Sequence, residues 1–232
     1  MKKLLSLILM SLILQPVLAA NYKATVYEQG SKQQKSLYTL QVEFLDPEQN
    51  ESVATYKDME GKAAVVETAS LKGSKLLKLE VDQKQLGQKG VIEVKDGKAL
   101  FTKVEADGKS STKEESLKDT FVASANFQRF IRDNWPAISD GKDVEFRYAV
   151  WDRQETVGFK VFKTGSEKLG EQDVLVLKMK PSSFVIAALV KPLILKFSAD
   201  GSKLLELNGR VAPKRKDGSN WKDLDGEVAY TY

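Results

Sequence analysis

Residues 38–44 read YTLQVEF, in which apolar and polar side chains alternate at almost every step. Because successive side chains of a β-strand point to opposite faces, this alternation predicts a strand with one buried and one solvated face. The same pattern returns at residues 77–81 and 144–150 and recurs along the chain, so strands are expected to dominate. The predicted buried face of the second run consists of Leu77, Leu79 and Val81.

Turn residues connect these runs into hairpins. Asp96-Gly97 and Asp200-Gly201 each lie between two apolar runs. Asp-Gly tolerates the positive φ angles of a tight hairpin, so both pairs of strands are predicted to be antiparallel. The polar stretch from Asp107 to Lys118 is predicted to be a mobile surface loop. Further turns are predicted at Asp107-Gly108, Gly165-Ser166 and Asp217-Gly218.

Two segments depart from the strand pattern. From residue 123 to residue 135 the apolar residues have helical spacing, with Ser124 as the predicted N-cap and Pro136 ending the helix. The second segment, from Ser183 to Val190, is apolar on every side. A helix of this kind is either covered all round or faces an apolar ligand.

These patterns predict a mainly β fold of the α+β class. We expect a strongly curved antiparallel sheet, or an incomplete barrel, with two short helices packed on its concave side. No internal repeat or linker divides the chain, so residues 20–232 are predicted to form a single β-rich domain.

The first residues predict export. Lys2 and Lys3 precede an apolar run at residues 4–14, and small residues follow Pro16. The run is shorter than the roughly 20 apolar residues that span a bilayer, so residues 1–19 are predicted to be a cleavable signal peptide. The mature protein is expected in the periplasm or outside the cell. The chain has no cysteine to carry acyl chains, so no stable membrane anchor is expected after cleavage.

The absence of both cysteine and histidine excludes several kinds of chemistry. The chain cannot form a Ser-His-Asp or Cys-His site, a histidine-ligated zinc centre or a thiol redox pair. We therefore predict no catalytic residue, no metal ligand and no cofactor. A pair of carboxylates for glycan hydrolysis remains open, although no pair stands out from the many acidic residues.

Charge is balanced along the chain. It has 36 basic and 32 acidic residues, and without Lys2 and Lys3 the balance is 34 to 32, a net charge of +2. No concentrated basic stripe is present, so nucleic acid is not an expected partner. The cluster at residues 214–216 is predicted to be a charged hairpin loop, with contact to an anionic lipid or polysaccharide as the alternative.

The apolar segment near residue 186 is the candidate ligand site. It either plugs the core or forms one wall of a pocket for an acyl chain, since pockets of this type are mostly apolar and lie in the mouths of curved sheets. The candidate ligand-binding residues are Phe184, Ile186, Leu189, Leu193, Leu195 and Trp135.

Part of the chain resembles known proteins. Residues 127–135 read FQRFIRDNW and precede Ile138, Gly141 and the strand at 144–150. With the later Phe184, Leu189, Pro192-Leu193 and Leu204 to Gly209, this C-terminal half resembles a family of uncharacterised secreted bacterial proteins. The order of strands and helices is more distantly similar to the half-barrels of lipoprotein carriers such as LolA, and this similarity implies a hydrophobic ligand cavity.

Three functions follow from these features. The first is a non-enzymatic periplasmic protein that binds a lipid or another hydrophobic or amphiphilic envelope ligand. The alternatives are a carboxylate-based glycan hydrolase and a structural envelope or assembly adaptor, which would expose an apolar patch. The sequence carries no signal for an oligomeric state.

Overall fold

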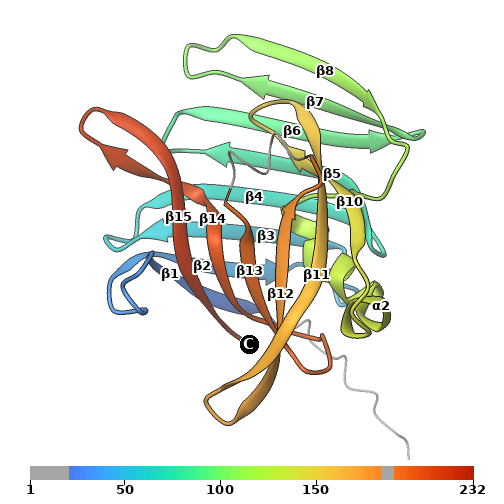
Figure 1. Cartoon of the computed structure of the whole chain (residues 1–232). Coiled ribbons are helices and arrows are strands. Elements are labelled where there is room, and N and C mark those ends of the chain that lie inside the picture. Colours follow the sequence, from blue (N-terminus) through green and yellow to red (C-terminus); the bar gives the residue numbers. More distant parts are fainter. Residues whose placement is uncertain (1–20, 184–190) are drawn as a thin grey trace, which may run out of the picture.

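The computed structural model describes residues 21–183 and 191–232, and strands dominate these ranges (Figure 1). The strands are β1 (Tyr22–Glu28), β2 (Ser36–Phe44), β3 (Glu51–Asp58), β4 (Ala63–Lys72), β5 (Lys75–Gln83), β6 (Gln88–Lys95), β7 (Lys98–Val104), β8 (Ser110–Ser116), β9 (Phe121–Val122), β10 (Val144–Val150), β11 (Glu155–Leu169), β12 (Gln172–Pro181), β13 (Leu193–Ser198), β14 (Leu204–Asp217) and β15 (Asn220–Thr231). The helical elements are η1 (Ser124–Asn126), α1 (Phe127–Asp133) and α2 (Trp135–Ser139).

All described strands join one sheet. Its order runs from β8 back to β1, then from β15 back to β9, so the first and last strands of the chain pair at the middle. Every pairing is antiparallel except that of β9 with β10. In Figure 1 the strands of the first half cross behind the nearly upright strands β10–β15. The mainly β fold and the strongly curved sheet, open between β8 and β9, are therefore confirmed.

The sheet curls until its two edges overlap. Ala149 and Thr156 lie on the face of β10 and β11 opposite to the core residues Phe146 and Phe159, yet both are buried. Glu115 on β8 covers this face: it accepts a hydrogen bond from the Thr156 amide at 2.8 Å. Side chains, rather than a backbone ladder, therefore join the two edges.

Alternation places the side chains largely as predicted. On β2, Leu40 and Val42 are buried and face the core. On β5 the predicted positions Leu79 and Val81 are buried. The prediction for Leu77 was wrong, because Leu77 is exposed and its neighbour Leu76 is buried instead. The pairing of β4 with β5 shifts register between Ser70 and Leu71, and this irregularity moves the buried position.

Four of the five predicted turns are confirmed as hairpin turns, including the one at Gly201. Gly165 and Ser166 instead lie inside β11, where the register with β12 shifts. The glycine marks a β-bulge, which has the same local signature as a turn.

The loop predicted from Asp107 to Lys118 is wrong for most of its length, because it contains β8. This strand pairs with β7 from Ser110 to Ser116 and is exposed on both faces. An edge strand held by backbone hydrogen bonds needs no apolar alternation, and its charged residues discourage pairing with other chains.

The helical region begins and ends differently from the prediction. Ser124 is not the N-cap: Ala123 holds that position, and its amide donates to Asn126 Oδ1 at 2.7 Å. Pro136 does not end a helix but lies in the first turn of α2, where a missing N–H costs little. No helix in the described ranges is long and apolar enough to span a bilayer. Residues 184–190 of the second predicted helix lie outside the described residues.

In the described ranges, buried apolar side chains group into three clusters, which half-buried residues connect. Cluster 1 joins α1 and α2 to β10–β14 and includes Ile131, Phe146 and Leu195. Cluster 2 lies on β4–β7 around Phe101, and cluster 3 lies on β1, β2 and β15 around Val26.

Asp200 gives the β13–β14 turn a pH-dependent contribution to stability. Hydrogen bonds from Ser198 and Ser202 lower its pKa from 3.8 to about 2. A lowered pKa means that the ionised form stabilises the fold above pH 3.8 and that this contribution is lost as the pH falls towards 2. We expect Asp200→Ala to lower the free energy of unfolding in urea at pH 7 and the deficit to shrink below pH 4.

The control for this comparison is Asp119→Ala, which removes an exposed carboxylate that has no hydrogen-bond or ion-pair partner in the described ranges. A deficit of Asp200→Ala that stays constant between pH 7 and pH 2.5 would contradict the role given to the ionised carboxylate.

Candidate functional site

The structure places three of the six predicted ligand-binding residues. Leu195 is fully buried in cluster 1, and Leu193 is half-buried beside that cluster. Trp135 begins α2 and packs against Phe197, with ring centroids 5.8 Å apart. The other three, Phe184, Ile186 and Leu189, lie outside the described residues. Ligand contact by these residues stays a prediction.

Tyrosines lie between the three clusters. Tyr56 on β3 contacts clusters 2 and 3, and Tyr230 on β15 contacts clusters 1 and 3. Each is only half-buried, although it lies on the face of the sheet that carries core residues. We call this face the inner face and the following residues the tyrosine-glutamate group: Tyr22, Tyr56, Glu67, Tyr148 and Tyr230.

Glu67 is an acidic residue among apolar side chains on the inner face of β4. Its neighbours on the same face of β4 are Val65 and Ala69, both buried. The Ser124 hydroxyl of η1 donates to the Glu67 carboxylate at 2.7 Å. Burial raises the pKa of Glu67, and the Ser124 hydrogen bond opposes that change. Glu67 is half-buried, and the Ser124 residue that its carboxylate contacts is exposed.

The hydroxyl groups of the tyrosines converge on this region. Burial raises the pKa of Tyr56, and the nearby groups of Tyr230, Glu67, Tyr22 and Tyr148 raise it further. Burial likewise raises the pKa of Tyr148, with Glu67 as the second cause. Residues from five strands thus lie close enough for their ionisations to influence one another.

The hydroxyls of this group retain bonding capacity. Tyr22 accepts a hydrogen bond from Gln128 of α1 at 3.2 Å, and its ring lies 6.1 Å from that of Tyr230. Within the described ranges, the hydroxyls of Tyr56, Tyr148 and Tyr230 have no hydrogen-bond partner, and none is among the fully enclosed unpaired atoms.

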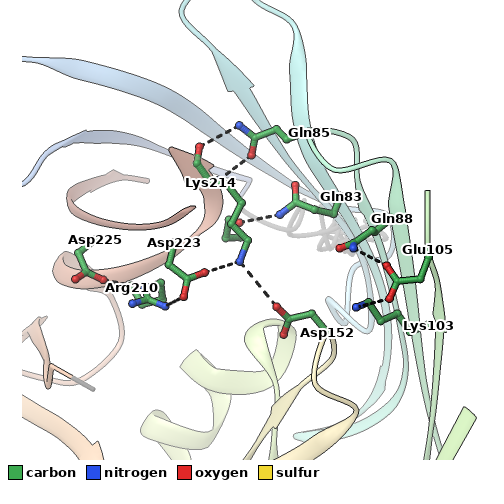
Figure 2. Close-up of polar contacts among 11 residues, drawn as sticks. Gln83, Gln85, Gln88, Lys103, Glu105, Asp152, Arg210, Lys214, Asp223 and Asp225 are labelled. Atoms are coloured by element: carbon green, nitrogen blue, oxygen red, sulfur yellow. Dashed lines mark hydrogen bonds and ion pairs between the residues drawn. The ribbon is translucent and has the colours of Figure 1, made fainter. Parts of the chain in front are cut away.

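Two glutamines bond to the backbone of β14, as Figure 2 shows. The Gln85 side chain accepts from the Lys214 amide at 2.7 Å and donates to its carbonyl at 3.1 Å, while Gln83 donates to the Ala212 carbonyl at 3.1 Å. The register of β14 with β15 shifts between Val211 and Lys214, which frees these backbone groups from the ladder. The glutamines thus join the β5–β6 turn to β14.

Ion pairs surround this junction. Lys214 Nζ lies 2.7 Å from Asp223 and 3.8 Å from Asp152 of the β10–β11 turn, and Arg210 pairs with Asp223 and Asp225 (Figure 2). Lys214, in the cluster predicted to be a charged hairpin loop, is on a strand and is largely occupied by intramolecular contacts.

Hydrogen bonds from Arg129 hold helix α1 against two loops. The Arg129 guanidinium donates to the carbonyls of Glu48 at 2.9 Å and Gly73 at 2.5 Å, to the Gln49 carbonyl, and to Asn50 Oδ1 at 3.3 Å. It therefore connects α1 to the β2–β3 loop and the β4–β5 turn. This clamp comes from the FQRFIRDNW segment that carries the sequence resemblance.

Two hollows of the described ranges lie elsewhere. One is an open depression on α2 near Pro136 and Lys142, and the other is a hollow of about 180 Å³ beside Glu115 and Arg147. Neither is lined by the predicted apolar residues.

The chemistry of the site favours binding. Glycoside hydrolysis needs two facing carboxylates, whereas the influences on the Glu67 pKa are burial and Ser124. No cluster of three or more metal-ligating side chains occurs in the described residues. A lone carboxylate among aromatic rings and free hydroxyls can bind a ligand that is apolar over most of its surface and polar at one point.

The sequence carries one signal of this group, which is not among the predicted ligand-binding residues. In residues 65–71 the alternating positions are Val65, Glu67, Ala69 and Leu71, so an acid occupies a core-facing position. The convergence of the tyrosines has no local signal, because each comes from a different strand.

Comparison with known proteins shows the fold. No protein-family model matches the chain, and no curated protein matches it. A solved structure of a β-barrel-like protein of the domain of unknown function DUF1849, from Brucella abortus, aligns with a TM-score of 0.52 at 13% identity over 91% of this chain and 95% of the other. A proposed outer membrane lipoprotein-sorting protein domain from Vibrio parahaemolyticus aligns with a TM-score of 0.32 at 10% identity over 92% and 82%.

The predicted distant likeness to half-barrel proteins is confirmed as a likeness of fold, and the first structure carries it. At 13% identity that likeness extends to the fold alone.

Proposed function

We propose that the interior beside the tyrosine-glutamate group binds a lipid or another hydrophobic or amphiphilic ligand, and that the protein does so in the periplasm after its signal peptide is removed. The role is one of binding rather than catalysis. In this proposal α1 and α2 pack on the concave side of the curled sheet and close the ligand space, and the half-buried Leu193 belongs to its apolar wall.

One observation carries the proposal: in the described ranges, half-buried aromatic side chains occupy the inner face between three apolar clusters. A domain of this size normally buries its inner face in one continuous core. Aromatic and apolar walls with a few polar groups are typical of small-molecule sites.

The test fills the interior from β3. Ala54 is on the same face as Tyr56 and is half-buried beside cluster 3, whereas Thr55 points to the opposite face. We expect the neutral fluorescent probe N-phenyl-1-naphthylamine to bind the wild-type protein saturably. Ala54→Trp should weaken this binding by about tenfold or more, since an indole would occupy the ligand space.

The matched control is Thr55→Trp, which adds the same side chain on the outer face and should bind the probe like the wild type. Far-UV circular dichroism checks that both variants fold, and Ala54→Met offers a smaller obstruction if Ala54→Trp does not. Absence of saturable binding to the wild type, or equal binding by folded Ala54 and Thr55 variants, would contradict the proposal.

A further inference from the structure

Glu67 has no positive partner in the described part of the chain. None of the ion pairs there includes Glu67, and no lysine or arginine is among the causes that shift its pKa. Within that part, the one hydrogen bond to its carboxylate comes from the neutral hydroxyl of Ser124. Asp223, by contrast, is paired with Lys214 and Arg210.

An unpaired carboxylate in such a position is costly. Burial removes water from the ionised group without a protein cation to replace it. A hydrophobic side chain at position 67 would suit its neighbours Val65 and Ala69 better, so the acid is unfavourable for folding alone. Such a group is explained if a ligand supplies the missing positive charge.

The surrounding tyrosines suit a cationic nitrogen. Phenol oxygens accept hydrogen bonds from a primary ammonium group, and tyrosine rings attract quaternary ammonium groups through their negative faces. Tyr56, Tyr148 and Tyr22 are the ionisable groups close enough for their pKa values to respond to Glu67, and none of them is positively charged. The region therefore combines the Glu67 carboxylate with neutral acceptors, and the charge of Arg132 acts on it at Tyr22, whose pKa it lowers.

We propose that the tyrosine-glutamate group binds the ammonium headgroup of an amphiphile, with the Glu67 carboxylate as its counter-ion and the apolar clusters beside it receiving the chain. This inference rests on the proposed function of the interior as a ligand site. It adds the chemical class of the headgroup.

The test compares ligands that share a dodecyl chain and differ in headgroup: dodecylamine, dodecyltrimethylammonium and the neutral dodecyl maltoside. Each competes with N-phenyl-1-naphthylamine below its micellar concentration. We expect at least one of the two cations to bind the wild type about tenfold more tightly than the maltoside. Tighter binding of dodecylamine would indicate that hydrogen bonds to the ammonium group dominate. Tighter binding of dodecyltrimethylammonium would indicate that contact with the tyrosine rings dominates.

Glu67→Gln should abolish the preference for the cation over the maltoside, because glutamine keeps the size and a Ser124 acceptor but lacks the charge. The matched control is Glu93→Gln, which makes the same change on the exposed face of β6 and should keep the preference. Tyr56→Leu should weaken cation binding. Tyr56→Phe should retain the part of the cation affinity that comes from contact with the aromatic ring.

The folded stability of Glu67→Gln gives an independent readout. Because the pKa of Glu67 is raised above 4.5, the wild-type fold is favoured below that pH and loses stability as the pH rises through the raised value. Without ligand, Glu67→Gln should therefore have a higher Tm than the wild type at pH 8, and the difference should narrow at pH 4.

The outcomes separate this inference from the proposed function. If no dodecyl compound displaces the probe, both are overturned. If the three headgroups compete equally, or if Glu67→Gln keeps the preference for a cation, the ligand site stands and the ammonium inference fails.

Discussion

Gly201→Ala should destabilise the protein by about 3 kcal/mol, because the new methyl group meets two obstacles at once. Gly201 has φ of +74°, a conformation that alanine adopts at a cost of about 1 kcal/mol or more. A Cβ there would also overlap the indole of Trp135, so the side chain that anchors α2 against β13 must move. In a protein of this length we expect the Tm to fall by about 9 °C, measured by circular dichroism.

The control is Gly218→Ala in the β14–β15 turn. Gly218 has φ of +60°, but a Cβ there would meet no atom within 4 Å. This variant should show only the backbone cost, so its Tm should fall by about a third as much. Equal losses in the two variants would mean that Trp135 does not hold α2 in the way described.

Arg129→Ala should cost about 3 kcal/mol, since it removes a charged donor from four acceptors on two different loops. The carbonyls of Glu48, Gln49 and Gly73 would lose this partner, and α1 would lose its connection to the β2–β3 loop and the β4–β5 turn. The free energy of unfolding in urea gives the magnitude, and hydrogen exchange should show faster exchange at residues 48–50 and 73.

Arg132→Ala is the matched control, because Arg132 is exposed and takes part in no ion pair or hydrogen bond of the described residues. It should change the stability by no more than about 0.5 kcal/mol. Arg129→Lys keeps the charge but not the planar donors, and we expect it to recover less than half of the loss. A similar loss in the two alanine variants would contradict the clamp.

The strands were predictable where one face is buried and the other is exposed to solvent. The runs at residues 38–44 and 144–150 have this form, and both are strands in the structure. β8 escaped prediction because an edge strand that is exposed on both faces carries no alternating pattern. The inner position on β5 was off by one residue because a register shift depends on the partner strand.

The candidate site was less predictable than the fold. The apolar pattern of the sequence predicted a ligand site at residues 184–190 and their apolar neighbours. The group that the described structure brings together consists of Glu67 and four tyrosines. An acid at a core-facing position of β4 was visible in the sequence. Its contact with Ser124, 57 residues away, was not.

By itself, the sequence determined that the described chain is mainly β, where four of its hairpins turn, and that no histidine or thiol chemistry is available. These are properties of composition and of a two-residue period, which neighbouring residues settle among themselves. Tertiary structure alone decided that β8 covers the outer face of β10 and β11, and that side chains from five strands meet around Glu67. Such contacts depend on how far the sheet curls and where its bulges shift the register, and both result from the packing of all the strands together.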